Sequence, residues 1–163
     1  MKMEQQHFKG PILEEYIAVN EAPLPRTELF ARDGSSRKID GSFACGDWLV
    51  VVEARAVGRS IGIERGQFEA IEFRNKVLDK ALYDIDEKAI WLRKHKAGKN
   101  YDVTKFKGLT PIAVTPFVEF VHSTSEHYWV DHETPRVLAP SELRELLDSD
   151  YFNQRRFNSV MFD

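Results

Sequence analysis

The chain has 163 residues, of which 42% are hydrophobic and 30% are charged, and its formal net charge at pH 7 is −3. This length and composition are typical of one globular domain, and no apolar run approaches the roughly 18 residues of a membrane-spanning helix. A net charge this close to zero excludes a globally basic nucleic-acid-binding protein, so any contact with phosphates must come from a local cluster.

The start of the chain, residues 1–6, is polar and lacks the apolar stretch of a secretion signal, and the single cysteine, Cys45, cannot form an internal disulfide. These features predict a cytoplasmic protein. We expect one domain over residues 1–163, with a core over residues 10–149. The aromatic-rich tail, residues 150–163, would pack either onto the domain or onto a partner.

Helix and strand patterns alternate along the chain. Proline after Gly10 suits the first turn of a helix, and a long run of apolar residues at helical spacing predicts a second helix. In chain order we expect a short helix after Pro11, strands over residues 27–32, 37–45 and 48–56, a long helix over about 64–94, strands over 111–114 and 136–139, and a helix over 141–149. This order, αβββαββα, predicts an α/β domain with a central mixed β-sheet flanked by helices.

A tight turn is predicted between the second and third strands. Gly46-Asp47 suits a two-residue hairpin loop with glycine first. If these two residues are the whole loop, Cys45 pairs with Trp48, which defines the register of the hairpin.

That register places Asp40 opposite Glu53 and Lys38 opposite Arg55, on one face because strand side chains alternate. Opposed Cβ atoms are roughly 5 Å apart, close enough for two carboxylates to hold one divalent cation. Without a cation the carboxylates repel each other, so the pair needs a metal ion or Arg55 as compensating charge. A surface ion pair of Glu53 and Arg55 at the end of a strand explains the same residues equally well.

The order of these motifs resembles the PD-(D/E)XK nuclease superfamily, which has the restriction-endonuclease-like fold. The family pattern is a helix with a glutamate, a hairpin with an aspartate on one strand and Glu-x-Lys on the next, and then a helix and another strand. The matching stretches are residues 10–14 (GPILE), 39–40 (ID) and 53–55 (EAR), with further likeness at residues 111–120 (PIAVTPFVEF) and 135–143 (PRVLAPSEL).

The resemblance implies metal-dependent hydrolysis of DNA phosphodiester bonds. Asp40, Glu53 and the backbone carbonyl of Ala54 would hold Mg²⁺ or Mn²⁺, because oxygen-only ligands favour a hard cation. Glu14 would complete or support the site from its helix, and Arg55 would face the scissile phosphate. The metal would act as a Lewis acid and lower the pKa of its water.

Arg55 departs from the family pattern, because active members usually have lysine at this place. An arginine can clamp a phosphate with two hydrogen bonds, but it stays protonated and cannot replace a lysine that activates water. Lys38, across the hairpin, is the candidate for a migrated lysine. The alternatives are an active endonuclease, a catalytically degenerate domain that binds DNA or a protein partner, and an assembly module whose carboxylates are structural. A homodimer or a partner domain in a longer protein is compatible with each.

A second candidate contact with DNA is the basic segment, residues 93–107 (RKHKAGKNYDVTKFK). Its lysines suit the solvated end of a helix as well as phosphate contacts. The predicted phosphate contacts in this segment are Lys96, Lys99, Lys105 and Lys107, and Lys38 on the hairpin is the fifth residue predicted to bind nucleic acid.

Other titratable residues are expected to lie outside the site. A spacing of five residues suits one face of neither a helix nor a strand, which disfavours a zinc site at His122, His127 and His132. Cys45 is expected to be a small buried hydrophobe. Arg74, among the acidic residues of the long predicted helix, is expected on a solvated face.

Overall fold

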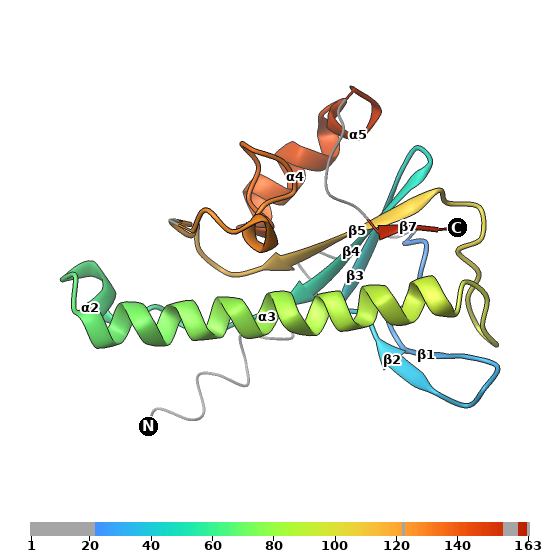
Figure 1. The fold of residues 1–163 in the computed structure, drawn as a ribbon, viewed down its shortest axis with the longest axis horizontal. Coiled ribbons are helices and arrows are strands. Elements are labelled where there is room, and N and C mark those ends of the chain that lie inside the picture. The colour runs from blue at the N-terminus through green and yellow to red at the C-terminus, as the bar shows by residue number, and fades with distance from the viewer. Residues whose placement is uncertain (1–21, 122, 155–159, 163) are drawn as a thin grey trace.

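The computed structural model describes residues 22–121, 123–154 and 160–162, so the expected first helix with Glu14 lies outside the described residues. The described chain forms a mixed α/β fold with a mixed sheet at its centre, as expected (Figure 1). The path across the sheet is β3 (Gly41–Cys45), β4 (Trp48–Ala54), β5 (Gly108–Val114) and β6 (Val137–Leu138), and β7 (Val160–Met161) pairs with β5. β3 is antiparallel to β4, whereas β4, β5 and β6 are parallel.

Helices cover both faces of this sheet. α3 (Phe68–Lys94) connects β4 to β5 on one face, and α4 (Pro140–Asp148) covers the other. Leu49 and Val51 belong to the core cluster on the α3 side, while Val50 and Val52 pack with Leu143 of α4. The continuous apolar run in β4 follows from this double cover, because a strand buried on both faces has no polar side.

The hairpin register is as predicted. Cys45 pairs with Trp48, and Gly46 has φ 57°, a left-handed conformation that favours glycine at this turn. The pairing continues as far as Gly41 with Val52. Asp40 and Glu53 therefore follow directly after the last paired residues.

Three details differ from the expected elements. The predicted strand over residues 37–45 is split, because β2 (Ser36–Lys38) leaves the main sheet and pairs with β1 (Glu28–Phe30) in a separate two-stranded sheet. The long helix begins at Phe68, after the short α2 (Ile61–Glu64) and Gly66, which has φ 66°. Residues after α4 form α5 (Tyr151–Gln154) and β7, and η1 (Glu126–Tyr128) precedes β6.

α3 is longer than the sheet that it covers. Its 27 residues span roughly 40 Å, whereas the seven residues of β4 span roughly 23 Å. Its N-terminal part therefore projects beyond the strand ends together with α2 (Figure 1). The first buried residue of α3 is Arg74, so the expectation that Arg74 is solvated is wrong. No helix in the described parts of the chain combines the length and hydropathy needed to cross a membrane.

Candidate functional site

Asp40 and Glu53 lie together at the end of the β3–β4 hairpin. Asp40 stands where the chain enters β3, and its Oδ2 accepts a hydrogen bond of 2.9 Å from the backbone N–H of Ala54. The carboxylate of Asp40 thereby takes the place of a backbone acceptor at the end of β4. The structure thus brings Asp40 and Glu53 to the same end of the hairpin, as the register predicts, and the contact with Ala54 is made by its N–H.

Glu53 is buried, with only 5% of its surface exposed. Burial raises the pKa of its carboxyl above the ordinary value, and the charge of Asp40 raises it further, while Lys88 and Arg55 oppose the rise. A buried carboxylate that lies near a second one needs positive charge close by.

Two cations supply that charge. The ammonium of Lys88, on α3, donates to Glu53 Oε2, and Arg55 Nη2 lies 3.0 Å from Glu53 Oε1. α3 lies over this face because Ile85 and Ala89, on either side of Lys88, pack into the core beneath it. Both oxygens of Glu53 are therefore paired with cations from the chain itself.

Arg55 makes a second ion pair with Asp84 on α3, so its side chain lies against that helix. Its Nη2 donates to Asp84 Oδ2, and Asp84 is also 3.2 Å from the ammonium of Lys80 one helical turn away. The Nε of Arg55 is buried and has no hydrogen-bond partner within the described residues. Arg55 is thus held between Glu53 and Asp84.

Lys38 completes the group from the strand side. Its ammonium lies 3.8 Å from Asp40 Oδ1, although its backbone pairs with Glu28 in the small sheet and not with Arg55. The charged cluster, as we call it, has three carboxylates and four cations, and Lys38 and Lys80 are its most exposed members. Its members are Lys38, Asp40, Glu53, Arg55, Lys80, Asp84 and Lys88.

Lys80, Asp84 and Lys88 were not predicted as site residues. Their spacing of four places them on one face of a helix, which is a usual pattern for solvated ion pairs. The signal that could have found them is position: this stripe borders the apolar stripe of Ile85 and Ala89, so it must reach the edge of the sheet. Sequence spacing does not say which strand end it meets.

The basic segment lies at the opposite end of β4. The backbone N–H of Lys107 donates to the carbonyl of Asp47 in the hairpin turn, and the two side chains form an ion pair. Asp47 precedes Glu53 by six residues, or roughly 20 Å of strand. The predicted phosphate contacts in this segment therefore do not join the charged cluster.

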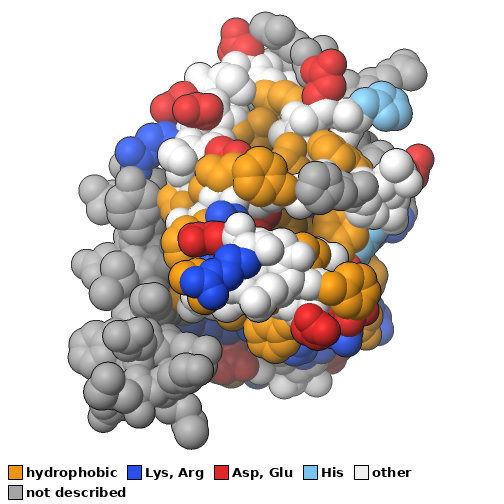
Figure 2. Space-filling model, turned by 90° about the vertical axis from the view of Figure 1, so that its left-hand side faces the viewer, with side chains coloured by type: hydrophobic (Ala, Val, Ile, Leu, Met, Phe, Trp, Pro, Cys, Tyr) orange, Lys and Arg blue, Asp and Glu red, His pale blue; other side chains and the backbone are white. Residues whose placement is uncertain are grey.

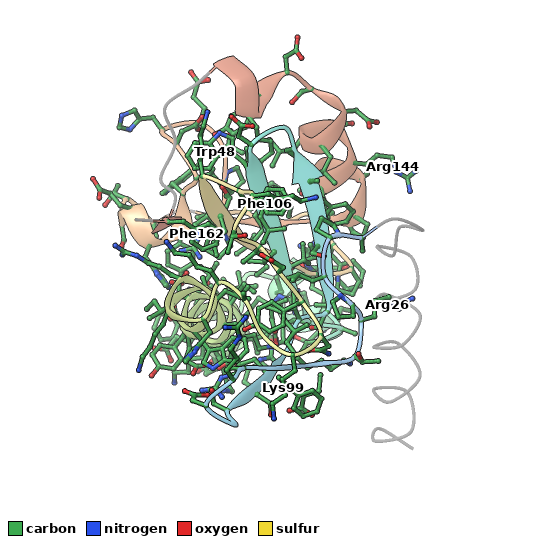
Figure 3. All side chains as sticks on the ribbon, turned by 90° about the vertical axis from the view of Figure 1, so that its right-hand side faces the viewer. Arg26, Trp48, Lys99, Phe106, Arg144 and Phe162 are labelled. Carbon is green, nitrogen blue, oxygen red and sulfur yellow. The ribbon has the colours of Figure 1, made fainter. Side chains whose placement is uncertain are left out.

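Most of these lysines have partners within the chain. The ammonium of Lys96 lies 5.6 Å from the ring centre of Phe162, and that of Lys105 lies 5.0 Å from the ring centre of Phe106. Lys99 is exposed and lies beside the small sheet, where its N–H donates to the carbonyl of Phe30. Figure 3 views this end and shows Lys99 apart from Phe106 and Phe162.

The two carboxylates fit a hard divalent cation. Mg²⁺ commonly takes one or two protein carboxylates and completes its shell with water. Asp40 and Glu53 supply such oxygen donors, and a cation beside them would oppose both burial and the charge of Asp40, which raise the pKa of Glu53. It would also have to displace Lys88 or Arg55 from Glu53. Among the described residues, no group of three or more histidine, cysteine or acidic side chains is arranged to hold a metal.

The remaining candidates lie elsewhere. His122 is outside the described residues, and the ring of His127 lies 3.4 Å from Asp86, which also pairs with Arg136. Cys45 is half-buried, and burial raises the pKa of its thiol to about 11.

No protein-family model matches the chain, and no curated protein or solved structure shows significant similarity to it.

Proposed function

We propose that this chain is a metal-dependent nuclease domain of restriction-endonuclease-like fold, which hydrolyses DNA phosphodiester bonds at the charged cluster. The observation that carries the proposal is the adjacency of Asp40 and Glu53 at a hairpin end, with cations packed against them. The succession of a hairpin, a helix and a further strand also supports the proposal.

Asp40 and Glu53 would hold Mg²⁺ or Mn²⁺, with the Ala54 carbonyl as a further oxygen donor. The ion would supply Lewis-acid polarisation of the phosphate. Asp40 is already oriented by the N–H of Ala54, so one of its oxygens is fixed before any ligand binds. Such preorganisation lowers the cost of assembling the site.

Lys88 supplies the lysine that position 55 lacks. It reaches Glu53 from α3, whereas the family lysine would come from β4 itself. An ammonium can give up or orient a proton near a reacting phosphate, which a guanidinium does poorly because it stays charged. A divalent ion held by Asp40 and Glu53 would compete with the ammonium of Lys88 for Glu53 Oε2, and that ammonium would then be available to a phosphate.

Arg55 and the two exposed lysines would bind the substrate. Arg55 can present its guanidinium plane to a phosphate, with Asp84 holding it from behind. Lys38 and Lys80 stand at the rim and would contact neighbouring phosphates. These cations would form the local positive surface that DNA binding requires in a chain of net charge −3.

One observation favours a second function, binding of DNA without cleavage. Both oxygens of Glu53 are paired with Lys88 and Arg55, so the cluster is compensated by the chain's own charges. In a degenerate domain these ion pairs would persist, and only the rim cations would contact phosphates.

Cleavage assays separate the two functions. Supercoiled plasmid and single-stranded oligonucleotides are incubated with Mg²⁺, Mn²⁺ or a chelator, using wild type, Asp40→Asn and Lys88→Met, with Lys76→Met as the control from the exposed surface of α3. We expect Asp40→Asn and Lys88→Met to lose roughly 100-fold or more of the metal-dependent rate, the usual scale for one preorganised group. Lys76→Met should cleave like wild type.

The results contradict nuclease activity if wild type cleaves no substrate with any metal. Binding without cleavage that is lost in a Lys38→Ala, Lys80→Ala variant would then support the degenerate domain. Cleavage that is equal in wild type and Asp40→Asn would contradict the charged cluster as the site of the reaction.

A further inference from the structure

A hollow of about 730 Å³ opens at the end of the molecule where α3 projects beyond the sheet. It lies between α2, the first half of α3 and residues 119–121 and 123–128, and hydrophobic side chains gather in the middle of this face (Figure 2). Its size is within the usual range of small-molecule sites. Apolar wall residues include Ile63, Ile71, Leu78, Phe120, Val121 and Tyr128.

A buried ion pair forms the charged part of this hollow. Arg74 is 4% exposed and donates to both oxygens of Glu119 and, over 2.9 Å, to the carbonyl of Val57. The hydroxyl of Thr115 lies 3.1 Å from Glu119 Oε1. Arg74 and Glu119 are therefore well satisfied, and their charges cancel.

Arg59 is the cation that is left over. Its Nη2 donates to the carbonyl of Val118 and lies 3.5 Å from Glu119 Oε2, which already pairs with Arg74. Its Nε is buried and has no hydrogen-bond partner within the described residues. A buried donor without a partner is costly, and an acceptor brought by a ligand would remove that cost.

The surrounding surface is unusually apolar. Ten large hydrophobic side chains are exposed among the described residues, and seven of them lie in residues 61–73 and 117–120. Two of the seven, Ile71 and Phe120, line the hollow itself. Clustered exposed hydrophobic side chains mark a binding surface, whereas single ones are normal. The concentration at this end favours a ligand with an apolar body.

We propose that this hollow binds a small amphipathic carboxylic acid. Its carboxylate accepts hydrogen bonds from Arg59, and its apolar body lies against Ile63, Ile71 and Leu78. Arginine and carboxylate match in geometry, and the pair is stronger than a neutral hydrogen bond.

Five charged side chains line the hollow, and together Arg59, Arg74, Glu64, Asp79 and Glu119 carry −1. Because Arg74 already donates to both oxygens of Glu119, Arg59 is the local positive charge that fits one carboxylate. Glu64 and Asp79 would repel the second charge of a phosphate dianion. An uncharged ligand would not form a charge-assisted hydrogen bond with Arg59, and a cationic one would be repelled by it.

This site is separate from the charged cluster. Arg74 and Asp84 are ten residues apart on α3, or roughly 15 Å along the helix axis. The ligand proposal therefore does not depend on nuclease activity.

Titration calorimetry with decanoate below its micellar concentration tests the proposal. The uncharged 1-decanol and the decylammonium ion serve as probes of the same length, and inorganic phosphate tests for a simple anion site. Arg59→Gln removes the charge, Arg59→Lys keeps the charge but removes the Nε donor, and Arg65→Gln removes an exposed arginine that does not line the hollow. Methyl NMR shifts of Ile63 and Ile71 locate the bound ligand.

We expect saturable decanoate binding that moves the Ile63 and Ile71 methyl signals. Arg59→Gln should raise the Kd for decanoate about tenfold, the effect of losing one charge-assisted hydrogen bond, and Arg65→Gln should leave it unchanged. Arg59→Lys should lie between wild type and Arg59→Gln, which also tests the idea if Arg59→Gln is unfolded by circular dichroism. Equal affinity for decanoate and 1-decanol, stronger binding of decylammonium or phosphate, or no saturable binding would overturn the proposal.

Discussion

Replacing Lys88 with methionine tests whether the charged cluster depends on a cation from α3. The change keeps the apolar stem but removes the ammonium from Glu53 Oε2. Glu53, with 6% of its side chain exposed, then keeps Arg55 as its one direct cationic partner among the described residues and still lies near Asp40. Breaking a buried ion pair by removing one partner costs about 3 to 5 kcal/mol.

We expect the lower end of that range, about 3 kcal/mol, because Arg55 stays in place and the Lys88 side chain is 17% exposed. For a chain of this size, about 1 kcal/mol corresponds to a Tm change of roughly 2 to 4 °C. Lys88→Met should therefore lower the Tm by roughly 6 to 12 °C without divalent metal. The exposed Lys76→Met should change it by no more than roughly 2 °C, as surface substitutions usually do.

The measurement is thermal unfolding by circular dichroism, with Glu53→Gln and the double variant to complete a double-mutant cycle. If the two side chains interact as the structure shows, the double variant is less destabilised than the sum of the single variants, because no uncompensated charge stays buried. Lys88→Met and Lys76→Met with equal Tm values would refute the contact between Lys88 and Glu53.

The same variant distinguishes an ion-pair cluster from a metal site. Removing the ammonium frees an oxygen of Glu53. Addition of Mg²⁺ should therefore raise the Tm of Lys88→Met more than it raises the Tm of wild type. A ligand that binds only the folded state adds RT ln(1 + [L]/Kd), and a lower Kd increases that gain. Equal Mg²⁺-induced shifts in wild type, Lys88→Met and Asp40→Ala would show that these carboxylates do not hold the metal.

Three further measurements follow from the charges and the pKa values. Because the pKa of Glu53 is raised, the folded state binds more protons above pH 4.5 than the unfolded state does. The stability of wild type relative to Glu53→Gln should therefore fall as the pH rises through the folded pKa. Chemical unfolding from pH 4 upward would measure this. In salt titrations of DNA binding, the double variant Lys38→Ala, Lys80→Ala should reduce the slope of log K against log salt concentration by roughly 0.9 for each lost phosphate contact. Alanine at the four lysines of the basic segment should reduce this slope less. Because burial raises the pKa of the Cys45 thiol from 9.0 to about 11, alkylation by iodoacetamide at pH 8 should be roughly 100-fold slower in the folded than in the unfolded chain.

The hairpin part of the site could be predicted because its register depends on local residues only. A two-residue turn with glycine first defines every opposed pair, and Asp40 and Glu53 follow from counting. The end of the hairpin could not be predicted in the same way. β2 pairs with β1 over six to ten residues of sequence, and this competing partner takes the chain out of the main sheet just before Asp40.

The contribution of α3 could not be read from the sequence, because it depends on how the helix sits on the sheet. The apolar stripe predicts which face is buried, but it does not say which turn of the helix lies over which strand end. Lys88 therefore looked like one of many helical lysines. The burial of Arg74 could not be predicted for the same reason, because its partner Glu119 follows β5, some 45 residues later in the chain.

The difference in length between α3 and the sheet explains why both charged features occur on this helix. The C-terminal two thirds lie over the strands, where apolar side chains fill the interface and Asp84 and Lys88 meet the end of β4. No strand of the described chain lies beneath the N-terminal third, and its first buried residue, Arg74, packs against the segment that follows β5. A loop covers a helix less completely than a sheet does, and the uncovered part is the hollow beside Arg59. A ligand in that hollow would occupy space that no part of the described chain fills, which is why we expect it to raise the Tm even in variants of the charged cluster.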